Sequence, residues 1–171
     1  MRCPRRAGRA AVLALTVLFA GVATVFGEDA RPALDALPTE RVVLETQAKG
    51  RHEYTAWRAD TPDTRARGLM YVAALTDDQA MIFVYDEPQR VSMWMKNTYL
   101  SLDMLFVDAR GCIVHVAERA RPLSLAAIES GAPVVLVVEI KGGAAAVRGA
   151  KIGDRIRRPE AAWPADARGG C

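Results

Sequence analysis

Histidine and cysteine, the usual ligands of structural metals, are scarce in this sequence of 171 residues, which holds two histidines and three cysteines. His52 and His115 are far apart in the sequence, and no Cys-x-x-Cys pair is present. A zinc site of the usual kind needs four such ligands, with some at short spacing. We therefore expect no metal site and no resident cofactor.

The familiar catalytic motifs are missing as well. The sequence has no phosphate-binding Gly-Lys-Thr loop, no Gly-x-Gly-x-x-Gly turn and no Gly-x-Ser-x-Gly elbow. His52-Glu53 begins like a zinc-protease helix, but Ala56 stands where the second histidine should be. These absences weaken an assignment as a nucleotide-binding protein or a common hydrolase, and whether the chain is an enzyme stays open.

An excess of positive charge is also lacking outside the N-terminus. The whole chain has 23 basic and 20 acidic residues, but four of the arginines precede the first acidic residue, Glu28. Residues 28–171 therefore hold 19 basic and 20 acidic residues, a net charge of about −1. A nucleic-acid-binding domain usually carries a clear positive excess, so we expect no nucleic-acid partner.

The N-terminus has the layout of a secretory signal peptide. Basic residues 2–9 precede an uncharged apolar run over residues 10–26, and small side chains occur just before Glu28. We expect residues 1–27 to be removed and the protein to be exported, either periplasmic or secreted. The alternative is an uncleaved membrane anchor, because 17 apolar residues are close to the shortest length that spans a bilayer. No later segment is long enough, so membrane contact is expected only through this one, if it is uncleaved.

The remainder divides into three parts. Two prolines indicate a linker over residues 28–40, and residues 41–158 predict a single compact domain. Prolines and glycines punctuate residues 159–171, which predicts a flexible tail. We therefore expect Cys112 and the tail residue Cys171 to stay unpaired, although a bridge between them is chemically allowed outside the cytoplasm.

Short apolar segments without regular strand–helix alternation predict an α+β fold, mainly antiparallel β, with a small barrel-like sheet and two or three short peripheral helices. A turn is expected at residues 86–88, after the third strand. The Thr61-Pro62 step is typical of a helix start. The expected strands are residues 41–47, 52–58, 80–85, 91–95, 104–107, 113–116, 134–140 and 152–156, and the expected helices are residues 62–67, 124–131 and 144–148.

Several blocks in order resemble one known family. They are Arg67-Gly68-Leu69-Met70, then Met93-Trp94-Met95-Lys96-Asn97-Thr98 with Leu102-Asp103, and finally Val137-Val138-Glu139. Together they are similar to the domain-of-unknown-function 192 family, an uncharacterised protein family. The resemblance implies a compact, mainly β domain, and many members share an export signal. It implies no settled activity.

The candidate ligand-binding residues come from these blocks. In an extended chain Met93 and Met95 face one way, while Trp94 and Lys96 face the other. Trp94 could stack on a planar ligand, and Lys96 and Asn97 supply hydrogen-bond donors. The alternative for Asn97 is a turn that ends the strand. The clustered methionines are expected to fill the core rather than bind copper.

Three further charged residues complete the candidate set. An ionised Glu139 within an apolar strand is costly unless it is paired, so we expect Arg67 to pair with it, with a ligand-facing role as the alternative. Asp103 either accepts backbone N–H groups, pairs with Lys96, or orients Lys96 toward a ligand.

These features favour a non-enzymatic exported binding module whose pocket is lined by Trp94, Lys96, Asn97, Asp103 and Arg67. Its expected partner is a small ligand or an envelope component. One alternative is an accessory of envelope assembly. The other is a hydrolase of envelope polymers that uses two carboxylates from Asp103, Glu118 and Glu139.

Overall fold

The computed structural model describes residues 34–161 and Cys171. The predicted signal segment, residues 1–27, lies outside the described residues, as do the first part of the linker and most of the tail. Within the described part, the helices include none long and apolar enough to cross a membrane.

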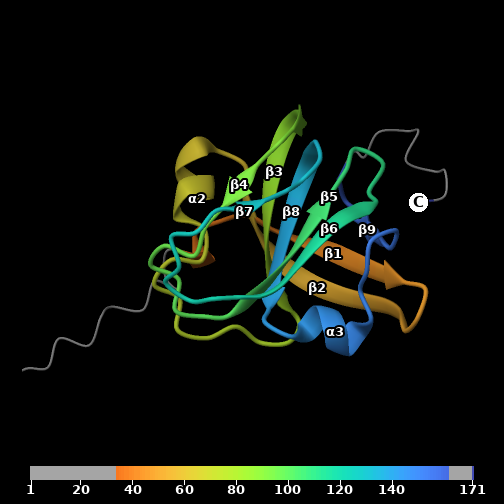
Figure 1. Ribbon diagram of the computed structural model, residues 1–171, viewed down its shortest axis with the longest axis horizontal. Helices are drawn as coiled ribbons and strands as arrows, with labels where there is room; N and C mark the ends of the chain where they lie inside the picture. The colour runs from red at the N-terminus through yellow and green to blue at the C-terminus, as the bar shows by residue number, and fades with distance from the viewer. Residues whose placement is uncertain (1–33, 162–170) are drawn as a thin grey trace, which may run out of the picture.

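Strands dominate the architecture (Figure 1). Seven of them form one sheet in the order β6-β5-β8-β3-β2-β1-β9, and β4 pairs separately with β7. The strands are β1 Thr39–Thr46, β2 Gly50–Ala59, β3 Gln79–Gln89, β4 Ser92–Met93, β5 Leu102–Val107, β6 Ile113–Ala120, β7 Ile128–Glu129, β8 Val134–Lys141 and β9 Arg155–Arg157, and the helices are α2 Pro62–Arg67 and α3 Ala144–Arg148.

The large sheet curls until its two ends meet. Strand β9 pairs with β1 at one edge, and Cys112, just before β6 at the other edge, forms a bridge with Arg155 of β9. The Ile113 amide also donates to the Asp154 carbonyl at 2.8 Å. The prediction of a strand-rich fold with a barrel-like sheet is confirmed.

Helix α2 occupies the connection between β2 and β3, two neighbouring strands that run parallel. It begins at Pro62 and ends at Arg67, as predicted, because Thr61 caps its first turn and Gly68 ends it at a φ of 48°. A Cβ atom on Gly68 would lie 3.1 Å from the Phe83 ring. Glycine therefore lets the end of α2 approach strand β3 closely.

Strand β8 lies in the middle of the sheet, between β3 and β5, and is buried on both faces as predicted. Val137 belongs to one hydrophobic cluster, whereas Val138 belongs to a second on the opposite face. Met81, Met93, Met95 and Met104 pack in the first cluster. The expectation that the methionines fill the core is confirmed for these four, whereas Met70, the fifth of the group, is only partly buried.

Two local predictions are wrong. The turn expected at residues 86–88 is part of β3, where the pairing with β8 shifts register between Val84 and Gln89. Such an irregularity tolerates a proline within a strand. Residues 124–131 do not form a helix, because the Ser124 carbonyl accepts from the Met95 amide and β7 pairs with β4. Tertiary hydrogen bonds thus override the local helix preference.

A third correction concerns the cysteines. Cys112 and Cys171 form a disulfide with their Cα atoms 5.5 Å apart, whereas we expected them to stay unpaired. Cys112 stands at the seam where the two ends of the sheet meet. The sequence pattern does not reveal this seam, which depends on contacts between distant segments.

Candidate functional site

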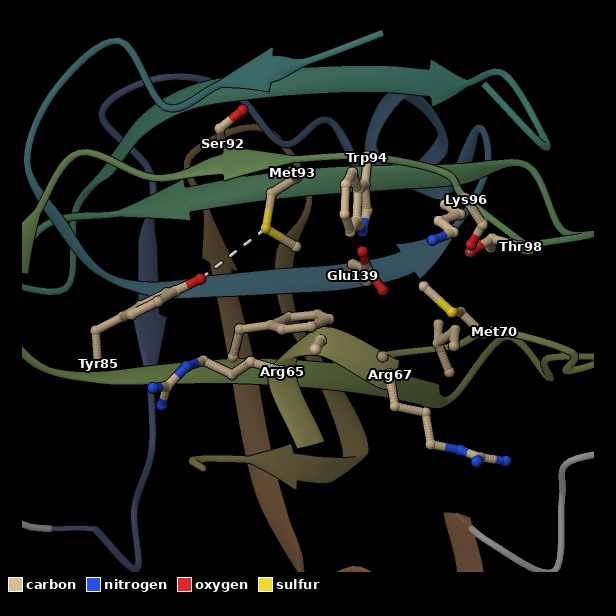
Figure 2. A pocket seen from close by; sticks show the side chains of 14 residues that line it. Arg65, Arg67, Met70, Tyr85, Ser92, Met93, Trp94, Lys96, Thr98 and Glu139 are labelled. Atoms are coloured by element: carbon tan, nitrogen blue, oxygen red, sulfur yellow. Dashed lines mark hydrogen bonds between the residues drawn. The ribbon is translucent and has the colours of Figure 1, made fainter. Parts of the chain in front are cut away.

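A pocket of about 210 Å³ opens between α2, strand β3, the segment that follows β4 and the central strand β8 (Figure 2). Its walls mix apolar and charged side chains. They come from Arg65, Ala66, Arg67, Gly68, Leu69, Met70, Phe83, Tyr85, Ser92, Met93, Trp94, Lys96, Thr98 and Glu139. The pocket unites two sequence blocks that we singled out, residues 67–70 and 93–98, with Glu139 from a third.

Glu139 projects into this pocket from β8, where its backbone neighbours are Met81 and Met104. The residue is only 4% exposed, and its carboxyl has no hydrogen-bond or ion-pair partner among the described residues. Burial raises the pKa of Glu139 to about 8. The carboxyl is therefore mostly protonated at neutral pH, and a protonated carboxyl can donate one hydrogen bond.

The predicted ion pair between Arg67 and Glu139 is wrong. Figure 2 shows the Arg67 side chain turned away from Glu139, although both residues line the pocket. Arg67 is the last residue of α2 and is exposed to solvent. Solvation of its guanidinium at the helix end explains why it does not turn inward to neutralise the acid.

The basic side chains around the pocket differ in how firmly they are held. Arg65 donates to the carbonyl oxygens of Asp60 and Val84 at 2.6 and 2.9 Å, and its guanidinium lies 5.1 Å from the Tyr85 ring centroid. The Lys96 ammonium lies 5.5 Å from the Trp94 ring centroid. Within the described residues, neither Lys96 nor Arg67 has a side-chain hydrogen bond to an acceptor. These two cations are free to meet a ligand.

Tyr85 adds a polar group to the apolar wall. Its hydroxyl approaches the Met93 sulfur at 4.0 Å, and burial is the main cause that raises the pKa of this phenol. Tyr85 is not among the site residues that the sequence predicts. Side chains alternate between the two faces of a strand, so Tyr85 lies on the same face of β3 as Met81 and Phe83. This alternation could have identified Tyr85 as a residue of the pocket wall.

The segment after β4 alternates as predicted, although the regular strand ends at Met93. Met93 and Met95 are buried, whereas Trp94 is 50% exposed. Asn97 does not line the pocket. It adopts a φ of 54° in a turn, donates to the Tyr71 hydroxyl at 2.7 Å and accepts from the Tyr71 amide at 2.9 Å. Asn97 therefore forms a turn that ends the extended segment, which is the alternative that the sequence offered for this residue.

Asp103 lies on the opposite face of the sheet from Glu139. Its two carboxylate oxygens accept the amides of Arg119, Gly143 and Ala145 at 2.7, 2.9 and 2.8 Å. No contact joins it to Lys96, and it is not part of the pocket wall. The alternative in which Asp103 receives backbone N–H groups is the one that the structure supports.

The three carboxylates considered for hydrolysis do not converge. Glu118 is exposed on β6, Asp103 is held on the far face, and Glu139 is the sole acid among the residues that line the pocket. Two facing carboxyl groups are needed for the usual glycosidase mechanisms. This pocket does not supply the second.

One family model matches the chain. Residues 43–158 match the model of DUF192, described as "Uncharacterized ACR". No curated protein matches the chain.

Two similar solved structures come from bacteria. One is a protein of Sinorhizobium meliloti 1021 described as a candidate transcription regulator, with 41% identity and a TM-score of 0.70, covering 72% of this chain and 95% of that one. The other is a protein of unknown function from Novosphingobium aromaticivorans DSM 12444, with 33% identity and a TM-score of 0.69, covering 71% and 86%. The first structure consists almost entirely of the shared domain, so a domain of this kind folds on its own.

Proposed function

The chain belongs to the uncharacterised DUF192 family, and we propose that it is an exported binding module that holds a small polar ligand in the Glu139 pocket. The observation that carries this proposal is the Glu139 carboxyl, which is buried, faces the pocket and has no partner among the described residues.

The unpartnered carboxyl supports binding because it is unfavourable for folding alone. Partial removal of the carboxyl from water is unfavourable, and this desolvation is what raises its pKa. A well-packed apolar side chain at position 139 would avoid that cost. A ligand atom that accepts a hydrogen bond from protonated Glu139 would satisfy the group.

The groups at the pocket wall indicate the chemistry of the ligand. Lys96 and Arg67 offer two unpaired cations, and Trp94 offers a half-exposed indole. We expect a ligand that carries an anionic group toward these cations and a carbonyl or hydroxyl group toward Glu139. A cavity of about 210 Å³ is smaller than the usual site for a drug-sized molecule, so the ligand is a small metabolite or a single chemical group of a larger envelope component.

Export has separate support from the disulfide between Cys112 and Cys171. Disulfides persist in oxidising compartments and are rare in the cytoplasm. N-terminal sequencing of protein recovered from the cell envelope should begin near Glu28. Recovery of the protein solely from the cytosol, with Met1 intact and the cysteines reduced, would contradict export.

The binding proposal is tested with residues 28–171, produced by export so that the disulfide forms. We expect small carboxylates or phosphate esters to raise the melting temperature in a thermal-shift screen, and calorimetry to give a saturable heat. Glu139→Leu and Lys96→Ala should each abolish this response. Lys151→Ala, which removes an exposed lysine that does not line the pocket, is the matched control and should respond like the wild type. Equal responses from all four proteins would contradict the pocket assignment.

A further inference from the structure

A second surface adjoins the pocket and extends beyond it, sharing Arg67, Trp94 and Lys96 with the pocket wall. Five of the seven exposed large apolar side chains among the described residues occur in three loops, which follow α2, β4 and β6. Their exposed fractions run from 40% to 72%. We call this surface the loop face, and its apolar members are Tyr71, Trp94, Tyr99, Leu123 and Leu125.

Direct contacts join the three loops into one surface. Tyr71 donates its amide to the Asn97 carbonyl, and its ring packs edge-on against Tyr99 with centroids 6.1 Å apart. On the other side, the Leu123 amide donates to the Thr98 carbonyl at 3.1 Å. The loop after β4 is therefore the middle of the face. Figure 1 shows the loops at one end of the molecule, away from the labelled C-terminus.

The charge of the loop face has a single sign. Within residues 66–76, 94–101 and 121–127 the charged residues are Arg67, Lys96 and Arg121, and none is Asp or Glu. The first loop ends in Asp77 and Asp78, of which Asp77 pairs with Lys141. None of the three basic side chains has an ion-pair partner among the described residues. Residues 28–171 as a whole carry a net charge of about −1, so the rest of the domain is more acidic than this end.

Three backbone positions of the loop face are held in an unusual conformation. Tyr71, Asn97 and Leu123 have φ values of 64°, 54° and 62°. Non-glycine residues rarely adopt such values, and a surface that maintains them has a fixed shape. The exposed tyrosine and leucine are therefore presented by ordered loops.

We propose that the loop face docks on a lipid bilayer that carries anionic headgroups. Tryptophan and tyrosine favour the headgroup level because one part of each ring is apolar and another is polar. Leucine adds burial at the acyl boundary, and basic residues add attraction to anionic lipids. Two copies of the face would bring like charges together, which disfavours self-association. This goes beyond the sequence-based expectation that only the N-terminal segment meets the membrane.

The test uses residues 28–171, which lack the apolar N-terminal segment, and measures co-sedimentation with vesicles. We expect binding to phosphatidylcholine vesicles that contain phosphatidylglycerol, weakening as salt is added. Vesicles of pure phosphatidylcholine should bind far less. Absence of binding to the phosphatidylglycerol vesicles at low salt would overturn the proposal.

Variants separate the loop face from the rest of the surface. Replacing Leu123 and Leu125 together by serine should weaken vesicle binding more than about tenfold, because two apolar side chains are lost from the contact. Arg121→Gln should weaken it about fivefold. The matched control replaces Val147 and Ile152 by serine, two side chains that are 69% and 64% exposed outside the loop face. An equal loss in this control would contradict the assignment.

Other occupants give different results. A concentration-dependent dimer in sedimentation equilibrium, abolished by the serine pair at 123 and 125, would assign the face to a second copy. Tight binding of polyglutamate without vesicle binding would assign it to an acidic protein. Glu139→Gln should bind vesicles like the wild type, so failure of the pocket proposal and failure of this one are distinguishable.

Discussion

Asp103 and Glu139 are two buried carboxyl groups on adjacent strands, and their surroundings are opposite. Asp103 pairs in register with Ile140, one residue beyond Glu139, but the two side chains lie on opposite faces of the sheet. Asp103 receives three backbone amides, whereas Glu139 has no partner among the described residues. Both groups are nearly inaccessible to solvent.

Under the proposed function, this difference separates a carboxyl group that stabilises the fold from one that binds a ligand. The Asp103 carboxylate joins β6 to the glycine turn and to the first turn of α3, because its three donors come from those segments. The Glu139 carboxyl forms no hydrogen bond to another segment among the described residues, and it faces a cavity. The two acids are buried to a similar degree, and they differ in the number of hydrogen-bond partners that each one has.

The largest expected effect comes from removing the satisfied acid. Asp103→Ala leaves up to three buried backbone N–H groups without an acceptor, each costing about 1–3 kcal/mol. We expect a loss of about 4 kcal/mol or more in the free energy of unfolding, measured by urea denaturation. A loss below about 1 kcal/mol would show that water replaces the carboxylate, and the contrast with Glu139 would disappear.

The pH dependence of stability should report on Glu139. Its pKa is about 8 in the folded protein and 4.5 ordinarily, so between these values the folded state keeps a proton that the unfolded state releases. The free energy of unfolding should therefore fall by a few kcal/mol as the pH rises from about 4.5 to 8, and level off above that. Glu139→Gln should remove this part of the pH dependence, as followed by urea denaturation at several pH values. An unchanged slope in the variant would mean that Glu139 titrates normally.

At high pH, replacement of Glu139 by an apolar residue should stabilise the protein. Glu139→Leu removes a desolvated acid from a pocket that contains Leu69, Phe83 and Met93, and we expect a gain of about 1–2 kcal/mol at pH 9. Thermal unfolding measures the change, with the same substitution tested at pH 5, where the gain should be smaller. Destabilisation at both values would indicate that Glu139 has an important structural partner.

The smallest effect on stability is expected at Lys96. Its ammonium lies over the Trp94 ring without an acceptor among the described residues, so Lys96→Ala should change the free energy of unfolding by less than about 1 kcal/mol. The same variant should lose ligand binding, as calorimetry would show. A clear destabilisation with unchanged binding would make Lys96 a structural residue like Asp103.

Local signals in the sequence were the most reliable guides. The bounds of α2 follow from Thr61, Pro62 and Gly68, which act within one turn of the chain. The run of apolar residues in β8, interrupted only by Glu139, predicted burial on both faces and identified Glu139 as a buried acid. Both features depend on residues that are close together in the sequence, so the local sequence pattern is sufficient to predict them.

Contacts between residues that are distant in the sequence could not be predicted from the sequence pattern. Asp103 was grouped with Lys96 because they are close along the chain, but a side chain's face depends on strand register. The Cys112–Cys171 bridge depends on closure of the sheet. The pairing of Arg67 with Glu139 was expected because both residues belong to blocks that resemble the family, yet the position of Arg67 at the helix end leaves it in solvent. In each case geometry between distant segments decided the outcome.

The central position of β8 has a consequence for how the chain folds. Strands β3 and β5 each pair with β8, which comes later in the sequence than both, so neither can complete its pairing until residues 134–141 arrive. Before then, two partial sheets present open edges that favour aggregation. Because the missing pairings are non-local, insertion of β8 should be slow compared with formation of the β1–β2 and β5–β6 hairpins. Strand β8, which carries Glu139, is therefore also the strand whose insertion joins the two partial sheets.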